Sequence, residues 1–182
     1  MLNVSAGEYT VSCSVGELPI TYSILVAQAR FHDDFGVRNS RGTALLVSVE
    51  RASKKVPELV VTQRFEPGPE SGFFPGVLIV PETHLLMIGA GTRLLAYDIN
   101  SVRRLWEDYA DTGFWFWKRH GQTILMSAEL ELAAWNLGGK KLWSAFTEPP
   151  WSYEVHGHEV ELDIMGSRAC FDLTRGPVFQ GE

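Results

Sequence analysis

The feature that most constrains the fold is a short motif that recurs three times in the second half of the chain. Each copy holds two mostly small apolar residues, an aromatic, an Asp or Asn and an apolar residue, then a turn and a closing aromatic. The copies cover 95–99 with 104–106, 133–137 with 141–143, and 169–173 with 177–179. The central aromatic steps by 38 and 36 residues (Tyr97, Trp135, Phe171), and the closing aromatic by 37 and 36 (Trp106, Trp143, Phe179). Two markers with nearly the same period indicate one supersecondary unit copied along the chain.

Each copy is preceded by two further apolar runs that end in turn residues, so a unit is interpreted as four short strands. The runs are 77–80 and 85–88, 114–117 and 123–126, and 152–155 and 160–164. The predicted fold class is all-β, with about four antiparallel β-meander units in a β-propeller-like or stacked arrangement. Helix is expected to be scarce, because no segment sustains a 3.6-residue period for three turns. Repeat units are predicted at 73–110, 111–148 and 149–182.

Three parts of the motif have a physical role. Asp98, Asn136 and Asp172 lie just before a turn, where a short side chain accepts backbone N–H bonds. The small residues before the central aromatic suit a strand packed between two neighbouring sheets. The closing aromatic is expected to cover the gap between adjacent sheets.

This pattern resembles the PQQ-like (quinoprotein-type) β-propeller repeat, over roughly residues 73 to 182. The resemblance implies that each repeat forms a four-stranded blade around a central channel. The chain departs from the family in having three clear units, and no set of residues corresponds to a quinone or calcium site. The resemblance therefore implies a fold; no dehydrogenase activity is inferred from it, and no cofactor is predicted.

Residues 1–72 are predicted to form an irregular first unit, so that 1–182 makes a single domain. Residues 20–27 favour a strand, and 43–49 with 58–62 favour a hairpin. Four units allow a minimal closed propeller, an open stack of sheets, or half of a ring completed by a partner. An open stack would leave a terminal sheet face uncovered, which favours self-association.

Composition excludes several classes of function. The formal net charge is −6, and the basic residues occur in scattered pairs, so binding to nucleic acid is not expected. The longest apolar runs are too short to span a bilayer, and the N-terminus shows no signal peptide, which predicts no membrane partner and a cytoplasmic location. The two cysteines, Cys13 and Cys170, do not make a disulfide framework.

The most metal-like group is His156 and His158, which have carboxylates nearby in the sequence. The alternative is that these histidines form the exposed first turn of the third unit, since His120 and Gly121 occupy the corresponding turn of the second. Residues 32–34, a His and two Asp, could hold a cation but are interpreted as a solvated loop. No serine stands in a nucleophile-elbow context, so nucleophilic catalysis has no support.

The run Phe114-Trp115-Phe116-Trp117 is the most unusual apolar segment. In a regular strand, Phe114 and Phe116 share one face, and Trp115 and Trp117 share the other. Both faces would then be apolar, as expected for a blade between two blades. The alternative is an exposed tryptophan face that binds a partner. The candidate partner-binding residues are Trp115, Trp117, Trp151 and Tyr153.

The sequence favours a non-enzymatic binding or protein-interaction module, for which an immunity-type or other partner-binding protein is one example. A metal-dependent enzyme that uses the His156 and His158 region is the alternative. A structural oligomer that completes a propeller between chains is a further alternative, so the expected partner is another protein or a second copy.

Overall fold

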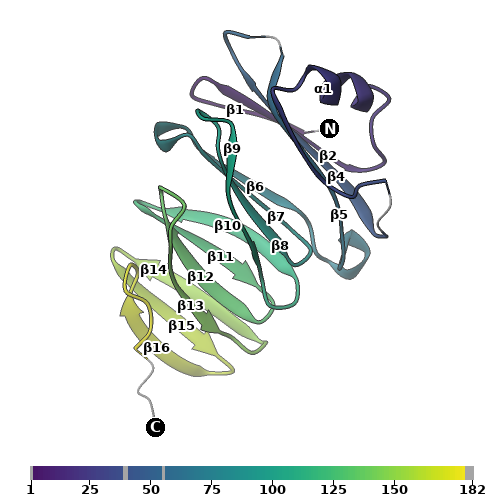
Figure 1. Ribbon diagram of the computed structural model, residues 1–182. Coiled ribbons are helices and arrows are strands. Elements are labelled where there is room, and N and C mark those ends of the chain that lie inside the picture. The colour runs from purple at the N-terminus through teal and green to yellow at the C-terminus, as the bar shows by residue number, and fades with distance from the viewer. Residues whose placement is uncertain (1, 39–40, 55, 179–182) are drawn as a thin grey trace.

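The computed structural model describes residues 2–38, 41–54 and 56–178, which form four β-sheets stacked face to face in a row (Figure 1). The first sheet has five strands, the second and third have four each, and the fourth has three. The prediction of an all-β fold built from about four sheets is confirmed. The described residues contain one seven-residue α-helix, and no helix among them is long and apolar enough to cross a membrane.

The first sheet has the order β1-β2-β4-β5-β3. Its strands are β1 (Leu2–Ala6), β2 (Tyr9–Gly16), β3 (Phe31–Phe35), β4 (Thr43–Arg51) and β5 (Pro57–Phe65). The predicted hairpin is confirmed, since β4 and β5 pair antiparallel. β3 pairs with β5 in parallel, so this sheet is mixed and is not a meander.

The prediction of a strand over 20–27 is wrong, because this segment contains α1 (Tyr22–Gln28). Tyr22, Leu25, Val26 and Ala29 pack together on the outer face of the first sheet, at the i, i+3, i+4, i+7 spacing of one helix face. The helix is about two turns long, so its period is too brief to stand out in an apolar run. Residues 32–34, predicted as a loop, belong to β3.

The three repeats follow one another as antiparallel meanders. The second sheet comprises β6 (Gly76–Val80), β7 (Leu85–Ala90), β8 (Arg93–Asp98) and β9 (Arg103–Tyr109), and the third β10 (Phe114–His120), β11 (Thr123–Ala128), β12 (Glu131–Asn136) and β13 (Lys141–Phe146). The fourth comprises β14 (Trp151–His156), β15 (Glu159–Ile164) and β16 (Ser167–Asp172). The described residues after β16 form no strand, and Phe179, the predicted closing aromatic, lies outside the described residues. Short 3-10 helices are Pro69–Ser71 and Pro81–Thr83.

Apolar side chains fill each gap between successive sheets. No such layer joins the described residues of the fourth sheet to the first, and the two sheets lie at opposite ends of the row (Figure 1). The described chain is therefore an open stack and not a closed ring. We call the edge formed by β1, β6, β10 and β14 the inner edge.

The closing tryptophans connect each repeat to the next, as predicted. Trp106 Nε1 donates to the Gly139 carbonyl at 2.5 Å, and Trp143 Nε1 donates to the Leu173 carbonyl at 2.9 Å. The same indoles pack on the central aromatic of the next unit, with centroid distances of 5.8 Å from Trp106 to Trp135 and 5.3 Å from Trp143 to Phe171. Each contact combines aromatic packing with a satisfied indole N–H.

The predicted role of the Asp or Asn at the turn is also confirmed. Asp98 Oδ1 accepts from the Asn100 and Ser101 amides, and Asn136 Oδ1 accepts from Gly138 and Lys140. Asp172 makes the same kind of bonds in the third unit. Burial alone would raise the pKa of Asp98, but hydrogen bonds from Ser101 and Asn100 hold it below its ordinary value. Hydrogen bonds from Thr174 and Arg175 likewise lower the pKa of Asp172.

Acid is expected to weaken the fold partly through these turns. A carboxylate with a lowered folded-state pKa contributes stability above its unfolded pKa of about 3.9, and this stability is lost as the pH falls through the folded pKa. Asp98→Asn should retain the turn, as Asn136 does, without titrating. Urea midpoints at neutral pH and at about pH 3 should therefore fall less for Asp98→Asn than for the natural chain; an equal fall would contradict this role.

The uncovered end of the stack is charged. The outer face of the fourth sheet carries carboxylates and one arginine, which forms ion pairs of 2.9 Å with Glu161 and 3.3 Å with Asp163; the members are Glu154, Glu159, Glu161, Asp163, Arg168 and Asp172. At the other end, α1 covers part of the first sheet. The uncovered terminal face expected of an open stack is therefore present on the fourth sheet, and its polar surface is typical of a capping repeat.

Candidate functional site

A β-bulge in β10 determines which aromatic residues meet. Phe114 pairs with Ala128 and Phe116 pairs with Ser127, so Trp115 is an extra residue in the strand. The bulge breaks the regular alternation, and the prediction that Trp115 and Trp117 share a face is wrong. Phe114 and Trp117 both pack between the second and third sheets, with ring centroids 5.3 Å apart.

Three of the four predicted partner-binding residues come together at the inner edge between the third and fourth sheets. Trp115 on β10 stacks on Trp151 of β14, with centroids 5.2 Å apart and planes at 15°. Tyr153 continues the stack at 6.4 Å from Trp151, and His120 meets Tyr153 edge-on at 6.2 Å. We call these four residues the aromatic row. All four are half-buried, and Phe116 beside them is 43% exposed.

Trp117 does not belong to the aromatic row. Its ring lies 5.4 Å from that of the buried Trp135, at 80°, within the core between the second and third sheets. Its role in the structure is therefore packing between these sheets.

The polar atoms His120 Nε2 and Tyr153 Oη of the aromatic row are buried, and both side chains are uncharged. Burial raises the pKa of Tyr153, and burial together with the nearby Lys118 lowers the pKa of His120, so both side chains are neutral at pH 7. Ser127 lies beside Tyr153 and offsets part of the rise in its pKa. Both hydroxyl oxygens, Tyr153 Oη and Ser127 Oγ, are buried.

His156 and His158 lie at the turn after β14. His156 Nε2 is 3.2 Å from Glu154 Oε2 on the same strand, and both side chains are mostly exposed. His158 lines a shallow depression together with His120, Val155 and Leu173. Across residues 2–38, 41–54 and 56–178, no group of three or more His, Cys, Asp or Glu side chains is placed to hold a metal ion. A metal site here stays a prediction from the sequence.

The residues of β3 that the sequence offered as a possible cation site form a partly buried hydrogen-bonded set with Thr62. His32 Nε2 lies 3.0 Å from Thr62 Oγ1, which donates to Asp34 Oδ1 at 3.1 Å. Thr62 is fully buried and Tyr22 of α1 packs edge-on against His32. Asp34 bonds the hydroxyl and not the imidazole, so this set fixes β3 in the sheet and does not form a nucleophile with an oriented base.

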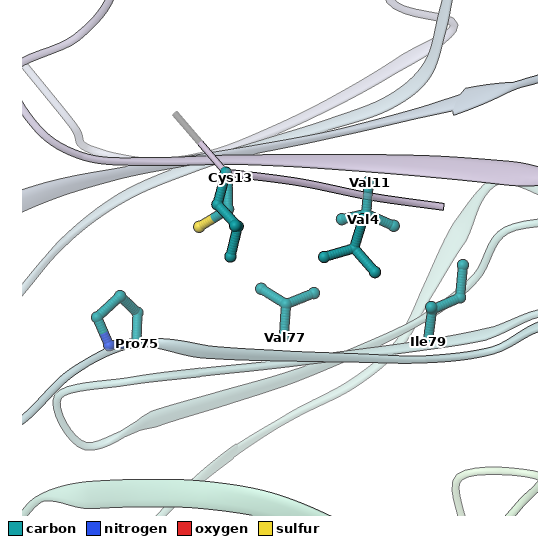
Figure 2. A pocket seen from close by; sticks show the side chains of 7 residues that line it. Val4, Val11, Cys13, Pro75, Val77 and Ile79 are labelled. Carbon is teal, nitrogen blue, oxygen red and sulfur yellow. The ribbon is translucent and has the colours of Figure 1, made fainter. Parts of the chain in front are cut away.

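The sequence analysis missed an apolar groove at the inner edge between the first and second sheets (Figure 2). It encloses about 110 Å³. Figure 2 shows Val4, Val11 and Cys13 directed from the first sheet toward Val77 and Ile79 of β6; the complete lining is Leu2, Val4, Val11, Cys13, Pro75, Val77 and Ile79. The alternation of apolar and polar residues over 2–6 was the sequence signal that could have indicated β1, which forms one side of the groove.

Comparison with known proteins found no matching family model and no matching curated protein. Partial structural likenesses exist to BamB from Moraxella catarrhalis (14% identity, TM-score 0.45, covering 75% of this chain and 46% of that one) and to hydrazine synthase of Kuenenia stuttgartiensis (16%, 0.43, covering 77% and 44%). A third is the computationally designed Ika4 protein (13%, 0.44, covering 65% and 76%). The chain spans less than half of the BamB and hydrazine synthase chains. The two four-stranded meanders and the three-stranded meander that follows them form a propeller-like repeat array over the described residues 76–172, as the sequence predicted.

Proposed function

We propose that this chain is a non-enzymatic protein-interaction module that holds a partner at the aromatic row and the adjacent Phe116. The observation that carries the proposal is the stack of Trp115, Trp151 and Tyr153 across two separate sheets, with Phe116 exposed beside it. In this function, residues 1–182 act as one domain in the cytoplasm. Inhibitory binding of the immunity type is one form of such partner binding.

Two properties of the aromatic row support binding in addition to packing. Large rings held against each other lose little conformational freedom when a partner docks, which is why Trp and Tyr dominate the energetics of protein interfaces. The corresponding inner-edge strand of the first repeat, β6, contains Gly, Val, Leu and Ile but no aromatic residue. The aromatic residues of β10 and β14 therefore exceed what the propeller-like repeat needs at this edge.

Phe116→Asp is expected to weaken partner binding by about 30-fold or more, the effect of losing one hot-spot side chain. The phenylalanine is exposed, so the charge should not unfold the chain. The matched control is Phe146→Asp, which replaces another exposed phenylalanine. Phe146 is 61% exposed and lies on β13, at the opposite edge of the third sheet. The partner is first captured by cross-linking in extracts of the source cells.

Dissociation constants are then measured with purified proteins by calorimetry, after circular dichroism has shown that both variants are folded. Loss of affinity in Phe116→Asp alone supports the aromatic row as the contact. Equal losses in both variants, or none in either, would place the contact elsewhere and reject the proposed site.

A further inference from the structure

The first and second sheets differ in width by one strand. At the edge opposite the inner edge, the last strands of the two sheets lie over each other. Tyr97 of β8 donates from its hydroxyl to Asp33 Oδ2 of β3 at 2.9 Å, and Arg104 of β9 lies 3.4 Å from the same oxygen. The guanidinium of Arg104 also lies 5.2 Å from the Phe35 ring centroid. Since β3 lies over β8 and β9, the additional strand of the five-stranded sheet is β1, at the inner edge.

β1 therefore extends beyond the second sheet. Its side chains that share the face of Val11 and Cys13 are Leu2 and Val4, which pair across from Cys13 and Val11. Val11 is buried in the core between the two sheets, whereas Leu2 is 67% and Val4 48% exposed. A regular alternation of apolar residues on a strand normally faces a covering layer. Here the position opposite β1, beside β6, holds no strand among the described residues.

This vacant position has the properties of a strand-binding slot. β6 is the first strand of its sheet, so β7 pairs with one side of it, and no strand among the described residues pairs with its other side. The apolar groove of Figure 2 lies against it, and none of its lining side chains carries a charge. Burial raises the pKa of the Cys13 thiol, which keeps it neutral as well.

From this geometry we propose that the slot beneath β1 accepts an extended segment of a protein partner, which adds a fifth strand to the second sheet along β6. The segment is uncharged and alternates apolar with polar residues, because one of its faces packs on Leu2 and Val4. β6 has five residues, so it can pair with a segment about 17 Å long. This inference rests on the proposed function as an interaction module and assigns a second site to it.

Another open edge in the fold fits such a segment less well. Within the described part of the chain β16 is also paired on one side only, but its outer face carries Arg168, which forms ion pairs with Asp163 and Glu161 of β15. Charged residues at a sheet edge disfavour the addition of an apolar strand. The slot beside β6 combines an open backbone with apolar cover, whereas β16 does not.

The probe is a displayed library of eight-residue peptides that alternate Val, Ile or Leu with Ser or Thr, compared with a library of the same composition arranged in apolar and polar pairs. Selection should enrich peptides from the alternating library only. Hydrogen exchange of the whole chain with a selected peptide should show slowed exchange of the Gly76–Val80 amides. Slowed exchange at β16 or β3 in place of β6 would overturn the assignment.

Matched variants test the cover strand. Val4→Asp is expected to weaken peptide binding at least about tenfold, while Ser5→Asp, with the same charge on the opposite face of β1, should leave it unchanged. Enrichment of no peptide, or equal binding by both variants, would overturn the slot. If the natural chain has a solution mass above the monomer value of 20.3 kDa and Val4→Asp has the monomer mass, the slot binds a second copy and the proposal is overturned.

The proposals for the two sites can be rejected independently of each other. Phe116→Asp should not alter peptide binding, because Phe116 lies on β10 and pairs with Ser127 on the face toward the fourth sheet. A negative result for Phe116 with a positive peptide result would reject only the aromatic row. The reverse pair of results would reject only the slot.

Discussion

Phe114→Ala is expected to lower the free energy of unfolding by about 3–5 kcal/mol, the range for removing a buried aromatic ring. Phe114 is fully buried, and its ring packs against Gly76 and Gly89, which pair across β6 and β7. A domain is stable by only about 5–15 kcal/mol, so this loss is a large fraction of the total. Urea unfolding followed by circular dichroism measures it.

The glycine side of the same contact gives a sharper test. A Cβ added at Gly89 would lie 2.5 Å from Cδ2 and Cε2 of Phe114. Replacing Gly with Ala where the backbone tolerates it normally stabilises a protein slightly. Here Gly89→Ala should instead destabilise by about 1–3 kcal/mol through overpacking.

Two further variants isolate the cause. Gly138→Ala, exposed and with only the Asn136 side-chain oxygen near the added carbon, should change stability by no more than about 0.5 kcal/mol. Gly89→Ala combined with Phe114→Leu should cost less than the sum of the single changes. Strict additivity would show that the glycine pair does not make room for the ring.

Trp135→Ala is expected to have an effect of similar size, about 3–5 kcal/mol. Trp135 is buried, stacks with Trp106 at 21°, meets Trp117 edge-on, and lies 5.2 Å from Lys141 Nζ. One side chain thus connects the second sheet to the third. Its removal leaves the indole of Trp106 without its stacking partner.

The control for Trp135 is Trp115→Ala, which removes an equally large but half-buried side chain. Its loss of stability should be clearly smaller, because part of the Trp115 surface is already in contact with water. A double-mutant cycle of Trp106 and Trp135 should give a coupling energy of about 0.5–1.5 kcal/mol. Equal losses for Trp115 and Trp135, or no coupling, would contradict the role of Trp135 in joining the sheets.

Much of the repeat region could be predicted from the sequence because its signals are local. The Asp or Asn before each turn bonds amides two to four residues away, so its role depends only on nearby residues. The period of the aromatics also indicated contacts between units, and Trp106 and Trp143 make them. These predictions needed no knowledge of how the sheets are placed.

The candidate site was only partly predictable. Trp115, Trp151 and Tyr153, chosen from the sequence as candidate partner-binding residues, lie together, but Trp117 was assigned to the face of Trp115 by regular alternation. The bulge that separates Trp117 from them is set by the pairing of β10 with β11, in which Phe116 takes the position opposite Ser127. Alternation along one strand does not show where its partner strand omits a residue.

By itself, the sequence determined an all-β array of repeated meanders with defined turns, because alternation and turn chemistry act within a few residues. The tertiary structure alone decided that the stack is open, that 22–28 is helical and that β1 overhangs the second sheet. It also decided the charged end face and the position of the aromatic row. These features depend on which strands pair and which faces are covered, and such contacts join residues distant in the chain.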